Sequence, residues 1–144
     1  MQNLELESLH QRIKRASGDY HVAQANLLDH LQDAERLRLH LYRGFSSMFH
    51  YVTKEIGLSE SCANNFINVA RKSLEVKELK EAIRQGHFGV SKARKITKVL
   101  KRSNQKQWIE DLKNKNTREI EKKVASKVIL AFSCMAYSPR NSRW

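Results

Sequence analysis

Proline and glycine are scarce in this chain, with one Pro and five Gly among 144 residues. A β-sandwich or barrel needs many turns, and these two residue types form most turns, so their scarcity argues against an all-β fold. The longest apolar run, 128–132, is also far shorter than the ~20 residues of a membrane-spanning helix. The N-terminus carries Glu5 and Glu7 and lacks the layout of a signal peptide, so we expect a cytoplasmic protein with no membrane partner.

Groups that could support catalysis or bind a metal are sparse as well. Cys62 and Cys134 lie far apart and form no C-x-x-C pair, so the sequence predicts free thiols and no metal site. Five of the six histidines recur about every ten residues, a spacing that scatters them around a helix. Neither a phosphate-cradling glycine loop nor a nucleophile motif occurs. We therefore expect no enzymatic activity, no cofactor and no small-molecule substrate.

Positive charge is abundant and unevenly distributed. The net charge is +12, and residues 92–123 contain 12 Lys or Arg against 4 Asp or Glu. Residues 1–42, with 5 basic and 6 acidic side chains, are close to neutral. A phosphate backbone is the natural partner of such an asymmetric surface. Ribosomal or acidic-membrane association would give the same net charge, so charge alone does not identify the partner.

Helical spacing of apolar residues recurs along nearly the whole chain, which predicts an all-α, multi-helical fold of six to eight helices. Residues 1–42 are expected to form a helical hairpin that turns at 17–19 and serves as the surface for dimerisation. Residues 43–130 are expected to form the main domain, and residues 131–144 an irregular tail. The further helices are expected at 59–72, 74–85, 92–102, 105–113 and 117–130, with Ser91 as the cap of the third and Asn116 with Glu119 as a capping box for the last.

A helix-turn-helix is predicted at residues 49–72, at the centre of the chain. Gly57 lies where the turn needs a positive φ. The inner contacts of the two helices are assigned to apolar side chains, namely Val52, Ile56, Leu58, Ala63 and Phe66. The polar side chains left on the outer face of the second helix are Ser59, Glu60, Ser61, Asn64, Asn65 and Asn68. An Asn amide can form two hydrogen bonds with adenine in the major groove, so this face is the candidate reader of base sequence.

Basic side chains flank the predicted reader helix. Arg71 and Lys72 are expected to bind phosphates at its end, and the helix expected at 92–102 adds Lys92, Arg94, Lys95 and Lys98. One helix-turn-helix covers only a half-site on DNA, which makes a homodimer plausible.

The assembled motifs resemble a bacterial family in which a small helical domain precedes an HNH endonuclease domain. The likeness covers about residues 27–124, and its landmarks are L-x-x-A-E-R-L-R-L-H-L-Y-R-G-F-S-S-M-F-H-Y (31–51), G-L-S-E-S-x-A (57–63), V-K-E-L-K-E-A-I-R-Q-G (76–86), S-K-A (91–93) and N-K-N-T-R-E-I-E-K (114–122). Residues 49–100 are also similar to the DNA-binding portion of ParB-type partition proteins, with S-K-A-R at 91–94 as a partial match. Both resemblances imply recognition of duplex DNA.

The nuclease activity of the longer HNH relatives is not expected here. Metal-assisted phosphodiester cleavage needs His, Asp or Glu ligands, and residues 125–144 contain none of them. The sequence therefore predicts a non-catalytic, nucleoid-associated DNA-binding protein. Two alternatives remain open at this stage: a helical module whose basic face binds an acidic protein, and an RNA-binding protein.

Overall fold

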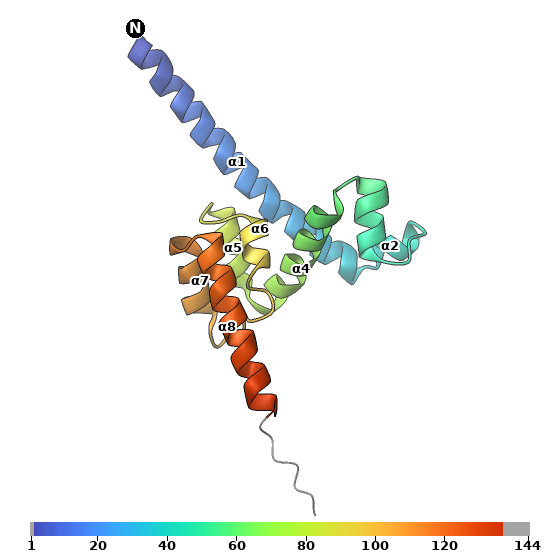
Figure 1. Ribbon diagram of the computed structural model, residues 1–144. Helices are drawn as coiled ribbons and strands as arrows, with labels where there is room; N and C mark the ends of the chain where they lie inside the picture. The colour runs from blue at the N-terminus through green and yellow to red at the C-terminus, as the bar shows by residue number, and fades with distance from the viewer. Residues whose placement is uncertain (1, 137–144) are drawn as a thin grey trace, which may run out of the picture.

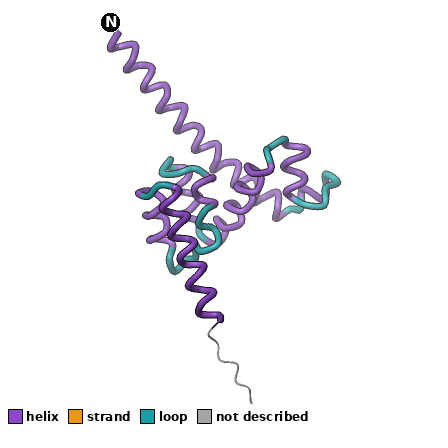
Figure 2. The backbone as a smooth tube through the Cα atoms, in the orientation of Figure 1, coloured by secondary structure: helices purple, strands orange, loops and turns teal. Residues whose placement is uncertain are grey.

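The structure, a computed structural model, describes residues 2–136, with the side chains of residues 2–130. All regular elements in this range are helical, which confirms the predicted all-α, multi-helical fold (Figures 1 and 2). The elements are α1 (Gln2–Arg36), α2 (Leu39–Tyr42), α3 (Met48–His50), the π-helix η1 (Tyr51–Ile56), α4 (Glu60–Glu75), α5 (Lys77–Arg84), α6 (Val90–Arg94), α7 (Gln105–Asn114) and α8 (Thr117–Ala136).

The predicted N-terminal hairpin is wrong, because α1 is one continuous helix that projects from the body of the molecule (Figure 1). Gly18 lies inside this helix, and a single interior Gly costs only about 1 kcal/mol relative to Ala, too little to break it. The chain reverses later, at Arg38, whose φ of 55° lies in the left-handed region.

The core joins the second half of α1 to the rest of the molecule, so residues 1–42 are not a separate unit. Leu28 is fully buried, and Leu31 and Ala34 belong to the same cluster as the buried residues of the later helices. Helix α4 packs against α1, α5, α6 and α3, and its buried side chains are Ala63, Phe66, Ile67, Val69, Ala70 and Ser73. This packing fixes which face of α4 remains available to solvent.

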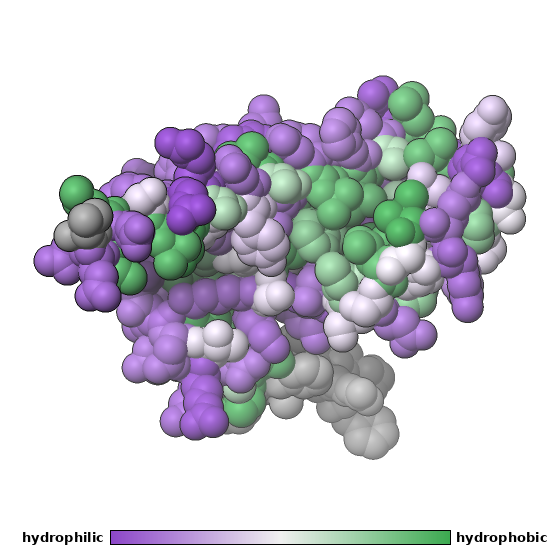
Figure 3. All heavy atoms as spheres, turned by 90° about the horizontal axis from the view of Figure 1, so that it is seen from above, coloured by the Kyte–Doolittle hydropathy of each residue, from purple (hydrophilic) through white to green (hydrophobic). Residues whose placement is uncertain are grey.

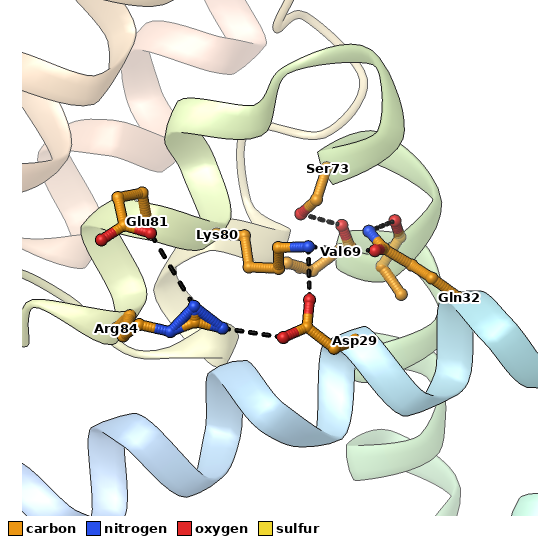
Figure 4. Close-up of polar contacts among 8 residues, drawn as sticks. Asp29, Gln32, Val69, Ser73, Lys80, Glu81 and Arg84 are labelled. Carbon is orange, nitrogen blue, oxygen red and sulfur yellow. Dashed lines mark hydrogen bonds and ion pairs between the residues drawn. The ribbon is translucent and has the colours of Figure 1, made fainter.

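A polar cluster also fastens α1 to α4 and α5 (Figure 4). The Asp29 carboxylate forms ion pairs with Lys80 and, at 2.7 Å, with Arg84. On the next turn of α1, the Gln32 side chain donates to the Ala70 carbonyl oxygen at 2.9 Å. The hydrogen bond from Lys80 lowers the pKa of Asp29, with Arg84 lowering it further, so this carboxyl stays ionised at neutral pH.

Local signals at the predicted helix-turn-helix are largely confirmed. Ser47 caps α3 by accepting a hydrogen bond from the His50 backbone N–H, and Gly57 has a φ of 87°. Val52 is fully buried. Ile56, however, was wrongly assigned to the interior, since 52% of its surface is exposed. Ile56 is the last residue of η1 and lies directly before the turn at Gly57, where the chain leaves the helix.

Several of the predicted helix ends are wrong in the central part of the chain. Helix α4 continues past Ser73, whose buried hydroxyl donates to the Val69 carbonyl oxygen at 2.7 Å and so does not interrupt the helix. The helix expected at 92–102 is only α6, which begins after Gly89 and not at Ser91. Beyond Arg94 the chain forms successive turns, because Thr97 bonds back to the Arg94 carbonyl oxygen at 2.9 Å.

The C-terminal helices follow the sequence more closely. The capping box of α8 is present: the Asn116 side chain accepts from the Glu119 N–H at 3.0 Å, and the Glu119 carboxylate accepts from the Asn116 N–H at 3.1 Å. Gly86 has the left-handed φ of 85° expected after α5. The irregular tail was placed too early, because α8 runs to Ala136. The remainder of the predicted tail, 137–144, lies outside the described residues.

Candidate nucleic-acid interface

Helix α4 presents a continuous polar stripe on the side opposite its buried face. The stripe follows the three- and four-residue spacing of one helical face. We call it the α4 stripe; its members are Ser61, Asn64, Asn65, Asn68 and Arg71. Ser61, Asn64 and Arg71 are exposed, whereas Asn65 and Asn68 are half-buried. The side chains of Asn64, Asn65 and Asn68 therefore lie outside the core, as predicted.

Hydrogen bonds within α4 distinguish the polar side chains from one another. Ser59 is exposed, but its hydroxyl accepts from the Cys62 backbone N–H at 3.2 Å and thereby caps the helix. Asn68 donates to the Asn64 carbonyl oxygen at 2.7 Å, which occupies part of its amide. The side chains of Asn64 and Asn65 form no hydrogen bond to any described residue, so their amides are available to a ligand. Glu60 lies in the first turn, where its charge complements the helix dipole.

The C-terminal end of the α4 stripe opens into a basic hollow of about 290 Å³. Its walls come from α4, from the end of α6 and from the turns that follow α6, and they contain no carboxylate. The lining residues are Asn68, Arg71, Lys72, Arg94, Thr97 and Lys98. Four cationic side chains around a space of this size suit a phosphate group. We call this space the basic hollow.

The cations of the basic hollow differ in their present partners. Arg71 forms an ion pair with Glu35 of α1 at 2.6 Å, and Lys72 forms one with Glu75 at 2.9 Å. Arg94 donates to the Thr97 hydroxyl at 3.0 Å. Lys98 forms no ion pair with any described residue and is exposed. Arg94 and Lys98 can therefore bind an anion without giving up an ion pair, and of these two Lys98 is the exposed one.

Not every predicted phosphate-binding residue reaches the hollow. Lys92 and Lys95 lie outside its lining, one turn around from Arg94 and Lys98. Lys95 instead pairs with Glu121 of α8 at 2.8 Å. Helical spacing by itself separates Lys92 and Lys95 from Arg94 and Lys98, and only the second pair lines the hollow.

A second basic hollow, of about 470 Å³, was missed in the sequence. Lys98 lines both spaces, so the positive surface continues from α4 to α8. The lysines of the second hollow are Lys98, Lys101, Lys123 and Lys127. Lys123 lies 4.8 Å from the centre of the Trp108 ring and also pairs with Asp111. The spacing of Lys123 and Lys127 on one face of a capped helix was a readable signal, but their approach to Lys98 depends on tertiary packing.

Other kinds of site find little support in the described part of the chain. Among the described residues, no group of three or more His, Cys, Asp or Glu side chains is placed to hold a metal ion. Within the same range, every helix is too short or too polar to span a bilayer. Comparisons with protein-family models, curated proteins and solved structures find no match to this chain.

Proposed function

We propose that this chain binds duplex DNA without catalysing a reaction on it. Helix α4 enters the major groove with its amide stripe facing the bases, and the basic hollow holds a backbone phosphate beside it. The observation that carries this proposal is the position of the hollow: four cations line it, its lining contains no carboxylate, and it continues directly from the α4 stripe. A surface with amides alone or cations alone would support it less.

The length of the α4 stripe is compatible with the major groove of DNA. The α4 stripe from Ser61 to Arg71 extends about 15 Å at 1.5 Å per residue, a span that fits along several base pairs. Asn64 and Asn65 are free to pair with base edges, and Arg71 and Lys98 lie towards the backbone. The continuation through Lys101, Lys123 and Lys127 provides a path for further phosphates of the same strand.

The resemblance to HNH-associated and ParB-type domains agrees with this proposal and remains a prediction, as does a nucleoid location. Because one such helix reads a half-site, two copies of the chain would contact two half-sites. The non-catalytic role is part of the same proposal and remains a prediction.

Selection from a random duplex library, followed by mobility shifts on the selected DNA, tests the proposal. We expect binding near 50 mM salt that weakens as salt rises, and an Asn64→Ala variant that loses about 1–3 kcal/mol of preference at the base it contacts. Ser61→Ala, on the same stripe, is the control for a change of shape without loss of an amide. Preference for structured RNA in direct competition, or binding only to acidic proteins, would replace DNA as the partner. No nucleic-acid binding at low salt would refute the proposal.

A further inference from the structure

The first half of α1 is a helix with no neighbour in the described part of the chain. Every residue from 2 to 20 is exposed, and the burial of α1 against the body begins at His21 and Gln24. Helices without tertiary packing are marginal in water at this length. A partner that covers one face of this segment would stabilise it.

Apolar side chains on this segment follow a heptad repeat, with spacings that alternate between three and four residues. We call this row the α1 seam; its members are Leu6, Leu9, Ile13, Ala16, Tyr20 and Ala23. The exposed fractions are 63% for Leu6, 45% for Leu9, 59% for Ile13 and 61% for Tyr20. Figure 3 shows hydrophobic side chains at the surface on the left, where the free end of α1 points towards the viewer. Sustained a/d spacing of this kind is the pattern of a coiled coil.

We propose that the α1 seam pairs with the α1 seam of a second copy of this chain, in an antiparallel coiled coil. The shapes of the seam residues select the orientation. An antiparallel register centred between Ile13 and Ala16 places Ile13 against Ala16 of the second copy, and Leu6 against Ala23 of the second copy. Each of these layers matches a large side chain with a small one. A parallel pair would instead stack Ala16 on Ala16 and leave a gap.

The charges beside the seam support the same register. Arg12 and Asp19 both occupy the position that precedes an a residue of the heptad, and in the antiparallel register Arg12 of each copy lies opposite Asp19 of the other. The two ion pairs that result are equivalent by symmetry. In a parallel pair, Arg12 would face Ser17. Residues 2–20 carry three acidic and three basic side chains, so this segment has no net charge that would favour an acidic or basic foreign partner.

This assembly would place the two bodies, each with its own α4 stripe, at opposite ends of the paired helices. It does not rest on DNA binding, because the seam and the basic surface lie on separate parts of the chain. Binding to DNA can therefore fail while the dimer forms, and the reverse is equally possible.

Sedimentation velocity and light scattering of the full chain test the inference. We expect about twice the monomer mass of 16.8 kDa at tens of micromolar protein. Ile13→Lys should convert the protein to a monomer, because it places two charges in the centre of the seam. Leu4→Lys is the matched control: Leu4 is 77% exposed on the same helix but faces away from the seam, and this variant should remain a dimer.

A charge exchange tests the register. Arg12→Asp and Asp19→Arg should each weaken the dimer at least tenfold, and the double variant should recover the wild-type dissociation constant. Near-ultraviolet circular dichroism around Trp108 checks that the body stays folded in all variants. A wild-type monomer at every concentration, equal effects of Ile13→Lys and Leu4→Lys, or double-variant affinity no better than the single variants would each overturn the antiparallel pairing.

Discussion

Replacing Lys98 by Ala removes an exposed cation of the basic hollow that has no ion-pair partner among the described residues. Lys98 lines both basic hollows, so its ammonium group lies where the two halves of the positive surface meet. Its side chain is exposed and forms no part of the core. We therefore expect Lys98→Ala to change DNA binding with little change in the free energy of unfolding.

The size of the effect follows from the release of counterions. Each phosphate that a protein neutralises on duplex DNA contributes about −0.9 to the slope of log affinity against log salt. Losing one contact at 0.1 M salt therefore lowers the affinity about eightfold, or about 1.2 kcal/mol. The loss should shrink towards zero near 1 M salt. If about six phosphates are bound in the wild type, the slope should change from about −5 to about −4.

Fluorescence anisotropy with one labelled duplex, measured from 50 to 400 mM salt, gives both slope and affinity. Lys113→Ala is the matched control, because it removes the same charge from the acidic hollow between α5 and α7, beside Glu78 and Glu81. The control should keep the wild-type slope within error. Equal losses in the two variants would mean that net charge alone drives binding. An unchanged slope in Lys98→Ala would refute the assignment of a phosphate to the basic hollow.

Two predictions concern the fold that holds this surface in place. Leu28→Ala, at a fully buried position on α1, should lower the free energy of unfolding by about 2–5 kcal/mol in urea titrations, whereas Leu74→Ala, 59% exposed on α4, should have little effect. Asp29→Asn should destabilise the protein at neutral pH, because the hydrogen bond from Lys80 lowers the pKa of Asp29 in the folded state. This stabilisation is present above the unfolded pKa and is lost as the pH falls through the folded pKa, so the melting temperatures of the two proteins should converge in acid, once Asp29 is protonated in the folded state. A gap between them that persists in acid would assign the effect to packing.

Local chemistry made several parts of the structure readable from sequence. Gly57 and Gly86 adopt the left-handed conformations expected of them, since no other residue type does so at low cost. The box formed by Asn116 and Glu119 is likewise a property of four consecutive residues. The outward direction of Asn64 follows from the apolar period of α4 alone.

The features that the sequence analysis predicted wrongly or missed depend on small differences in free energy or on residues that are distant in the sequence. A turn at Gly18 was expected from composition, yet the backbone gains more from continued helical hydrogen bonds than one Gly loses. Ile56 lies at the end of η1, directly before Gly57, and apolar spacing alone does not reveal where this π-helical segment ends. The joining of the two basic hollows at Lys98 required the approach of α8 to the turns after α6, which only the tertiary structure supplies.

The ion pair that Arg71 of the α4 stripe forms with Glu35 is energetically compatible with DNA binding. Arg71 and Glu35 form an ion pair in which the arginine side chain is 55% exposed, and exposed pairs of this kind contribute about 0–1 kcal/mol. A phosphate contact at 0.1 M salt is worth about 1.2 kcal/mol and is accompanied by the field of neighbouring phosphates. Replacing Glu35 by a DNA phosphate as the partner of Arg71 therefore changes the free energy of binding little. Lys98 has no ion pair to lose when it binds a phosphate, so it contributes the whole free energy of that contact. The affinity for DNA should therefore depend more on Lys98 than on Arg71.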